Sequence, residues 1–254
     1  MNQVQLFVIG DEILSGKRQD RHLTRVIELL NERGIALAAA HFLADDETRI
    51  ADALRAAIDE GDIVLSCGGI GATPDDVTRQ AAALAFGVPI ERHPEAAALI
   101  HQRSGGEASG NRLIMADFPQ GAELIPNPIN TIAGFSCDHC YFVPGFPEMA
   151  WPMLEWVLDE RLPQLHNAEP PEEFRLRVYG VRGESDLLDL MHDILARFEG
   201  IKLSSLPSHG GPGMRPHIEF GIRGARGFAA EAFMCLRATL KADAQIEVED
   251  LKLP

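Results

Sequence analysis

Short apolar runs alternate with amphipathic segments along the first part of the chain. Apolar runs of four to nine residues predict buried strands, and apolar residues spaced by three and four predict helices. Strands are expected at 4–9, 35–43, 62–67 and 141–143, and helices at 21–33, 48–60, 75–86, 94–103, 111–115 and 148–162. We expect a loop at 104–110 and an irregular segment at 123–141. Alternating strands and helices predict an α/β fold, with a mostly parallel sheet covered on both faces.

A proline-containing stretch at 163–172 has linker composition and separates this pattern from a second one. After it, strands are expected at 174–181, 201–206, 217–222 and 245–248, and helices at 184–198, capped by Ser185, and at 228–240. The order β-α-β-β-α-β is that of the ferredoxin-like fold. We therefore predict two domains, one at 1–165 and a smaller α+β domain at 172–254.

Three glycines lie between the strand expected at 62–67 and the helix expected at 75–86. Gly68, Gly69 and Gly71 carry no Cβ, so the backbone there can turn tightly and approach a ligand. Thr73 is a suitable N-cap, and Asp76 stands three residues later, as in a capping box. A glycine-rich turn that leads from a strand into a helix commonly presents backbone N–H groups to phosphate. This turn matches neither of the two common phosphate-binding glycine motifs.

Acidic residues follow three of the predicted strands, in the loops 10–16, 44–47 and 66–76. The carboxyl ends of parallel strands meet at one edge of a sheet, so we expect these loops to converge. Taken singly, Asp75, Asp76, Asp46 and Glu47 are also explained as acids in the first turn of a helix, which the macrodipole stabilises by about 0.3–1 kcal/mol each. The convergence of the three loops favours a site for a divalent cation that bridges to a phosphate. The acids concerned are Asp11, Glu12, Asp45, Asp75 and Asp76.

The turn 144–148 is a second connection from a predicted strand into a predicted helix. It either reaches the same edge of the sheet or is a proline-rich turn that starts the helix, and the sequence leaves both interpretations open. His22 is the histidine that we expect to face this edge. The histidines form no ligand-spaced set, and none lies near Cys67 in sequence, so no nucleophilic triad is predicted.

The formal net charge of −15 disfavours general nucleic-acid binding and docking on anionic membranes, both of which need basic surfaces. The N-terminus shows no basic segment before an apolar core, and no apolar run approaches transmembrane length. We expect a cytoplasmic protein. Cys137 and Cys140 have C-x-x-C spacing, but a zinc site would need a second ligand pair. We interpret them as reduced cysteines on a strand or bend.

Five motifs occur in a specific order along the chain: Gly10–Gly16, Ala44–Asp46, Gly68–Thr78, Ile125–Asn127 and Val143–Met149. The series resembles the MoaB/Mog (molybdopterin-binding) domain over residues 1–165. It is most similar to the amino-terminal part of competence/damage-inducible protein A (CinA). The small domain, with the segment 180–185, is also similar to the one that follows in CinA. No counterpart of the carboxy-terminal deamidase domain of CinA is expected within these 254 residues.

This resemblance implies a three-layer α/β fold and a ligand site at the rim of the sheet, for molybdopterin or a related phosphorylated pterin or nucleotide. Asp45 and Asp76 match acids needed for adenylyl transfer in Mog-type proteins. A divalent metal (Mg, Co or Mn) is expected on Asp11, Asp45, Asp75 and Asp76. The expected ligand-binding residues are Gly10, Glu12, Ser66, Gly68, Gly69, Gly71, Thr73, Thr78, Asn127, Gly145, Pro147 and Glu148. Family members form dimers or trimers, so a homo-oligomer is expected.

Three hypotheses follow. The first is a CinA-like protein that binds a phosphorylated pterin or nucleotide with a divalent metal. The second is a metal-dependent ADP-ribose or dinucleotide pyrophosphatase, an activity associated with related domains. The third is a non-catalytic regulatory or assembly module. The chain departs from the family pattern at Ala72, which replaces a proline, at His22, which replaces an asparagine, and at Leu113, which replaces a lysine.

Overall fold

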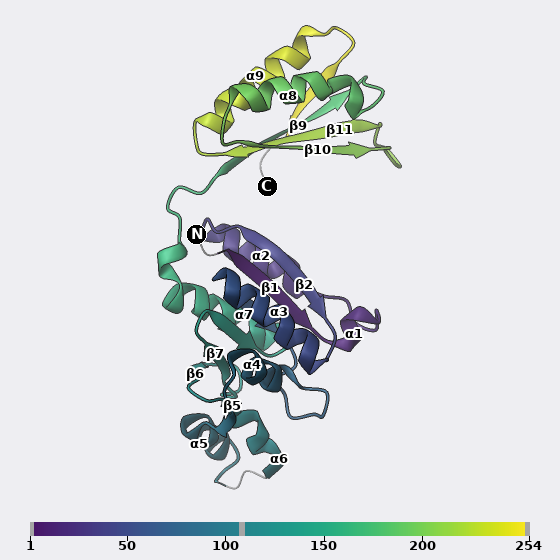
Figure 1. Cartoon of the computed structure of the whole chain (residues 1–254). Helices are drawn as coiled ribbons and strands as arrows, with labels where there is room; N and C mark the ends of the chain where they lie inside the picture. Colours follow the sequence, from purple (N-terminus) through teal and green to yellow (C-terminus); the bar gives the residue numbers. More distant parts are fainter. Residues whose placement is uncertain (1–2, 107–109, 252–254) are drawn as a thin grey trace. The chain divides into compact units, whose positions relative to one another are not determined.

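The protein is described by a computed structural model that covers residues 3–106 and 110–251. The chain divides into two compact units, Met1–His166 and Asn167–Pro254 (Figure 1). The loop expected at 104–110 includes residues 107–109, which lie outside the described residues. Each unit is described by itself.

The first unit contains eight strands and seven α-helices within the described residues. The strands are β1 (Val4–Ile9), β2 (Leu37–Leu43), β3 (Ile63–Cys67), β4 (Ile90–Arg92), β5 (Asp117–Pro119), β6 (Glu123–Ile125), β7 (Gly134–Cys137) and β8 (Cys140–Val143). The helices are α1 (Asp11–Leu14), α2 (His22–Glu32), α3 (Glu47–Glu60), α4 (Thr78–Phe86), α5 (Pro94–Arg103), α6 (Gly110–Leu113) and α7 (Pro147–Trp156). A 3₁₀ turn (Ile114–Ala116) follows α6, and a π-helical turn (Val157–Arg161) and a 3₁₀ turn (Pro163–Leu165) follow α7.

The main sheet has six strands in the order β2-β1-β3-β8-β7-β6 and is mixed. The four strands from β2 to β8 pair in parallel, as predicted. β7 runs antiparallel to both of its neighbours, so three of the five strand pairs are parallel and the sheet is mixed, with β7 running against the other five strands. The physical reason is the tight turn between Cys137 and Cys140, which returns the chain directly along β7. The segment at 123–141 was therefore wrongly predicted to be irregular, because β6 and β7 are only three and four residues long.

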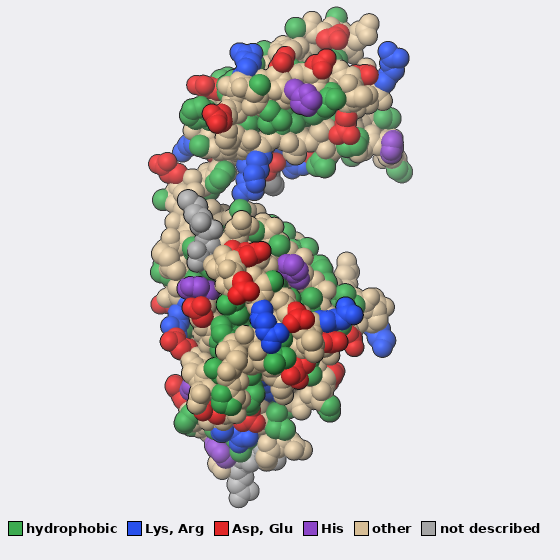
Figure 2. Space-filling model, in the orientation of Figure 1, with side chains coloured by type: hydrophobic (Ala, Val, Ile, Leu, Met, Phe, Trp, Pro, Cys, Tyr) green, Lys and Arg blue, Asp and Glu red, His purple; other side chains and the backbone are tan. Residues whose placement is uncertain are grey.

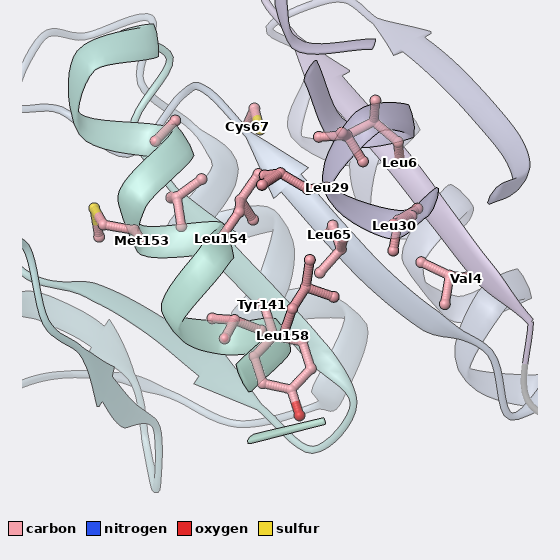
Figure 3. Packing of buried hydrophobic residues seen from close by; sticks show 14 of the residues in the cluster. Val4, Leu6, Leu29, Leu30, Leu65, Cys67, Tyr141, Met153, Leu154 and Leu158 are labelled. Carbon is pink, nitrogen blue, oxygen red and sulfur yellow. The ribbon is translucent and has the colours of Figure 1, made fainter. Parts of the chain in front are cut away.

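Two hydrophobic layers cover the faces of this sheet. Because side chains alternate along a strand, Leu6 and Val8 of β1 pack toward α2 and α7, whereas Phe7 packs toward α3 and α4. Figure 3 shows the first layer, in which Leu154 of α7 lies among side chains of α2, β3 and β8. Full burial of one such leucine stabilises the fold by about 1.5–3 kcal/mol. The result is the expected helix–sheet–helix arrangement of three layers.

The start and end of α3 follow directly from the sequence. The Asp46 carboxylate caps the helix by accepting a hydrogen bond from the Arg49 N–H at 3.0 Å. Gly61 ends the helix with φ at 72°, a left-handed conformation that glycine adopts without strain. Because this cap fixes Asp46, it also restrains the preceding Asp45 in the short loop between β2 and α3.

The second unit has four strands and two α-helices among the described residues. These are β9 (Glu172–Tyr179), α8 (Leu188–Arg197), β10 (Lys202–Ser208), β11 (His217–Gly224), α9 (Phe228–Ala242) and β12 (Glu247–Leu251). The antiparallel sheet has the order β10-β11-β9-β12 (Figure 1). Its inward residues, such as Val178 and Phe220, share a core with Leu236 of α9. The prediction that Ser185 caps a helix was wrong, because a 3₁₀ turn (Glu184–Leu187) precedes α8. The assignment of this unit as a ferredoxin-like domain stays a prediction.

Candidate functional site

A cavity of about 640 Å³ lies where the loops after β1, β2, β3 and β8 converge. This convergence was expected from the parallel order of these strands. Most of the residues predicted for the site contribute to the cavity wall. They are Gly10, Glu12, Asp45, Gly68, Gly69, Gly71, Thr73, Asp75, Asp76, Asn127 and Gly145. The turn 144–148 therefore does reach the site, through Gly145.

Five of the predicted residues lie outside this wall. Asp11 supports the wall indirectly, because its N–H donates to Asp45 Oδ2 at 2.8 Å and its carboxylate accepts from the Asp45 N–H at 3.3 Å. Ser66 is buried within β3. Thr78 is buried at the start of α4, where its hydroxyl donates to the Gly68 carbonyl at 3.0 Å. Pro147 and Glu148 line a neighbouring cavity of about 300 Å³.

Glycine is required at two positions of the turn after β3. Gly68 has φ at 110°, and a Cβ there would lie 2.2 Å from the Ile9 carbonyl oxygen. Gly69 has φ at 69°, and its Cβ would lie 2.1 Å from Thr78 Oγ1. Both positions combine a left-handed backbone with close packing, which excludes a side chain. The turn is thereby held against β1 and α4.

The predicted capping box of this turn was wrong. α4 begins at Thr78 rather than at 75, and its N-cap is Val77. The Asp76 carboxylate instead accepts hydrogen bonds from the N–H and the hydroxyl of Thr73, and the Asp76 N–H donates to the Thr73 carbonyl at 3.0 Å. This local turn replaces the first turn of the helix, because one carboxylate satisfies both donors of Thr73.

The glycine turn leaves several N–H groups for a ligand. Within residues 3–106 and 110–251, the N–H groups from 69 to 72 donate to no backbone or side-chain acceptor. The same four residues line the cavity. Consecutive free N–H groups in a glycine-rich turn form a concave donor site for anions. These four N–H groups are consistent with the predicted role of the turn in phosphate binding, which stays a prediction.

The charged side chains of the wall are mainly acidic. Four carboxylates, those of Glu12, Asp45, Asp75 and Asp76, line the cavity. Arg18 is the single Lys or Arg on the wall among the described residues, and it lies 3.6 Å from Glu12. Burial raises the pKa of the Asp45 carboxyl, and the negative charges of neighbouring acids raise it further, although the Asp11 N–H opposes this shift. Asp45 therefore takes up a proton more readily than a solvent-exposed aspartate does.

Apolar side chains complete the wall. Met115, Ile132 and Met149 line the cavity together with the Asn127 amide. Asn127 is buried, and its side chain donates to Asn130 Oδ1 at 2.8 Å and to the Ile132 carbonyl at 3.0 Å. These bonds hold the segment 127–132 in place. Asn127 thus shapes the wall through internal hydrogen bonds.

The donor set suits a hard divalent cation, but no metal cage is preformed. Among the described residues, no group of three or more His, Cys, Asp or Glu side chains is arranged to hold a metal ion. Mg²⁺ is commonly bound by one or two carboxylates and the phosphates of its ligand, with water completing the shell. The carboxylates of the wall fit such a shared site, and the metal role of Asp11, Asp45, Asp75 and Asp76 stays a prediction.

Arg79 was not predicted from sequence as a site residue, and His22, which was expected to face the rim of the sheet, lies beside the main cavity rather than in its wall. Arg79 is fully buried beneath the glycine turn, and its signal was its position on the buried face of α4 with Thr78 and Ala82. His22 is also buried, with Nε2 at 3.2 Å from the Gly145 carbonyl oxygen, and burial lowers its pKa. It lines the smaller cavity rather than the main one.

The remaining sequence predictions concern the thiols and the surface. Cys137 and Cys140 face each other across the β7–β8 hairpin as free thiols, and burial raises the pKa of each to about 12. Such thiols are protonated at neutral pH and thus unreactive. Acidic and basic side chains are scattered over the face shown in Figure 2, without a continuous basic area. Throughout 3–106 and 110–251, each helix is too short or too polar to cross a membrane.

Comparison with known proteins agrees with the motif series. Residues 5–165 match the family model described as a probable molybdopterin binding domain. A CinA-like protein of Geobacter sp. (strain M21) is 31% identical over 211 residues, which are 80% of this chain and 50% of that protein. A CinA-like protein of Citrifermentans bemidjiense is 37% identical over 166 residues, covering 62% of this chain and 40% of the relative. This chain thus spans half or less of the length of these two relatives.

A solved structure shares the fold of the first unit. CinA from Thermoplasma acidophilum, a protein described with unknown function, superimposes with a TM-score of 0.58 at 26% identity. The match covers 63% of this chain and 99% of that protein. The expected resemblance to the MoaB/Mog-like, CinA-type fold is confirmed.

Proposed function

We propose that this chain, which belongs to the molybdopterin-binding domain family, binds a phosphorylated pterin or nucleotide together with a divalent metal in the main cavity. The observation that carries the proposal is the shared wall of that cavity. It brings four N–H groups of the glycine turn, which have no partner among the described residues, together with carboxylates of two other loops (Glu12 and Asp45) and of the same loop (Asp75 and Asp76). The N–H groups suit phosphate oxygens, and the carboxylates suit a cation that accompanies the phosphate.

Each part of the wall has a role in this proposal. The N–H groups at 69–72 donate to the phosphate, and Met115, Ile132 and Met149 contact the flat ring. Asp45, Asp75 and Asp76 would hold the cation, which would neutralise the phosphate and polarise its oxygens. The carboxylates alone would repel a phosphate, so the ligand is expected to bind with its metal.

A second candidate function rests on Asp45. A carboxyl with a raised pKa beside a ligand cavity suits proton transfer. In a pyrophosphatase reaction, Asp45 would accept the proton of a water molecule whose oxygen attacks one phosphorus of a dinucleotide. The bond from that phosphorus to the bridging oxygen would break, and the other phosphate would leave. If the site binds no nucleotide or pterin, the chain is better explained as a regulatory or assembly module.

The experiment is calorimetric titration of the wild-type chain with AMP, ADP-ribose and a pterin phosphate, each with Mg²⁺ and with a chelator. We expect saturable binding that weakens when the metal is removed. The Asp76→Asn variant is expected to bind about tenfold more weakly, a loss of about 1.4 kcal/mol. The control is Asp189→Asn, which changes an exposed acid on α8 in the second unit.

Two outcomes would count against these proposals. Absence of binding by all three ligands to the wild type would eliminate the ligand-binding function. Chromatography of the ADP-ribose mixtures tests the pyrophosphatase candidate with Mg²⁺, Co²⁺ and Mn²⁺. Equal hydrolysis rates for the wild type and Asp45→Asn would remove Asp45 from that reaction.

A further inference from the structure

Arg79 is a buried arginine directly behind the glycine turn. It lies on the first turn of α4, is 2% exposed, and is the largest of the fully buried side chains. Burying a charged group is unfavourable unless an opposite charge or several hydrogen bonds compensate for it. An arginine in this position therefore requires an explanation beyond packing.

The contacts of Arg79 are made with neutral groups. Its Nη1 donates to the Ile114 carbonyl and its Nη2 to the Gly71 carbonyl, each at 2.5 Å. In the described part of the chain, no carboxylate lies within ion-pair distance of its guanidinium. The acids that act on it through space, Asp76 and Asp117, have other partners: Asp76 accepts from Thr73, and Asp117 pairs with Arg92. Burial lowers the pKa of Arg79, but an arginine stays charged at neutral pH.

The hydrogen bond to Gly71 also orients the turn. In a trans peptide, the C=O of one residue and the N–H of the next point in opposite directions. Because Arg79 holds the Gly71 carbonyl inward, the Ala72 N–H of the same peptide is directed away from Arg79. Ala72 lines the main cavity, and its N–H has no partner among the described residues. Arg79 thus fixes a donor group of the proposed phosphate cradle.

The charge of Arg79 matters because of the acidic wall. Four carboxylates line the cavity, and Arg18 is the single cationic side chain among the described residues of the wall. Arg18 is more than half exposed and lies near Glu12, so solvent and that carboxylate weaken its field. Arg79 lies behind the turn in a region that water does not reach. Its field is screened less, and it acts on the side of the cavity where the free N–H groups lie.

We propose that Arg79 is a positioning residue for anion recognition, which fixes the Gly71–Ala72 peptide and makes the acidic cavity selective for ligands with a phosphate at the glycine turn. This inference rests on the proposed function, because it concerns the same cavity. It goes further by naming the residue that makes the phosphate a requirement for binding. A phosphate monoester is expected to bind, and the corresponding uncharged alcohol is expected to bind much more weakly.

The test compares AMP with adenosine, which differ by the phosphate alone. Affinities are measured by NMR titration of the full chain in the presence of Mg²⁺, for the wild type and for Arg79→Met, which keeps an unbranched side chain but removes the guanidinium and its charge. We expect Arg79→Met to weaken AMP binding at least tenfold and to leave adenosine binding unchanged. Arg79→Lys is expected to recover part of the AMP affinity, since lysine keeps the charge but lacks the fork that reaches two carbonyls.

Arg33→Met is the matched control, because Arg33 is a largely buried arginine of the same unit that pairs with Asp159 and lines neither cavity. It is expected to bind AMP as the wild type does. The inference is wrong if Arg79→Met binds AMP like the wild type. It is also wrong if the variant loses AMP and adenosine affinity equally, since a purely structural role would affect both. If Arg79→Met does not fold, the same comparison is made with Arg79→Gln. A wild type that binds neither compound would instead contradict the proposed function.

Discussion

Asp45 shows how the surroundings of one carboxyl set its chemistry. It stands just after the edge strand β2, where the N–H of Asp11 anchors it beside Glu12 and Asp75. Partial burial and this negative surrounding disfavour its ionised form, so its pKa is raised in the folded protein. Ionised Asp45 therefore stores unfavourable energy in the free protein, which a bound cation would relieve.

This leads to a prediction for the Asp45→Asn variant. A folded-state pKa above the unfolded one gives stability that is complete below the unfolded pKa and is lost as pH rises through the folded pKa. The asparagine side chain would keep an acceptor for the Asp11 N–H without the charge. We expect the variant to have a higher Tm than the wild type at pH 7, with the difference shrinking toward about pH 4. Thermal unfolding followed by circular dichroism over this pH range measures it.

Asp46→Asn is the control for this experiment. The substitution is the same and affects the next residue, but Asn caps a helix about as well as Asp does. We expect no comparable gain in Tm at pH 7. An Asp45→Asn variant that is less stable than the wild type at pH 7 would show that the carboxylate is favourably placed, contrary to our interpretation.

At the scale of elements, the connection between β3 and α4 determines the site. Buried Thr78 donates to the Gly68 carbonyl, Asp76 closes a turn on Thr73, and Arg79 holds the Gly71 carbonyl. The bonds of Thr78 and Arg79 come from the start of α4 and act on the loop that precedes it, and the Asp76 turn lies within that loop. The helix thereby serves as a rigid support for a loop whose own N–H groups stay free for a ligand.

The turn gives a prediction that separates crowding from backbone strain. Gly69 and Gly87 have nearly the same φ, 69° and 68°, but only a Cβ at Gly69 meets nearby atoms. A left-handed alanine is unfavourable by about 1–2 kcal/mol, which is the loss expected for Gly87→Ala. Gly69→Ala should lose about 1–3 kcal/mol more, because its Cβ overlaps Thr78 Oγ1. Urea unfolding measures the free energy of unfolding of both variants. Equal losses of stability would show that Thr78 and α4 move to accommodate the new Cβ at little cost.

At the scale of the whole molecule, the chain consists of two units with separate hydrophobic cores. The family model covers only the first, up to residue 165. The second unit has a separate sheet, and none of the described residues that line the main cavity belongs to it. We propose that the two units are domains that fold independently, with a boundary near 166.

Limited proteolysis of the full chain tests this boundary. Residues 167–171, between the Pro163–Leu165 turn and β9, are exposed and belong to no helix or strand. We expect early cleavage between 163 and 172, which yields two fragments that resist further digestion, and mass spectrometry identifies their ends. The prediction fails if the first stable fragments end inside a helix or strand of either unit.

The sequence by itself determined the layers of the fold and the edge where the site lies. Apolar runs predict β1 and β3, and apolar residues at helical spacing predict α2, α3 and α7. These elements are predictable because each buries an apolar face, so the spacing of its apolar residues follows the period of the strand or helix. The glycines of the turn were also evident, since left-handed and crowded positions leave few alternatives. The capping box failed because the Asp76 carboxylate serves a local turn that competes with the helix end.

The tertiary structure decided the features that the spacing of residues along the chain does not determine. The direction of β7, the burial of Arg79 and the separation of Glu148 from the main cavity depend on contacts between distant segments. From sequence, the glycine turn is expected to bind phosphate, and Asp75 and Asp76 are expected to hold a cation. In the fold, Asp76 closes the turn, Asp75 joins the acidic wall, and Arg79 supplies the opposing charge from behind. Long-range electrostatics of this kind arises only once the chain has folded, because it depends on distances through space.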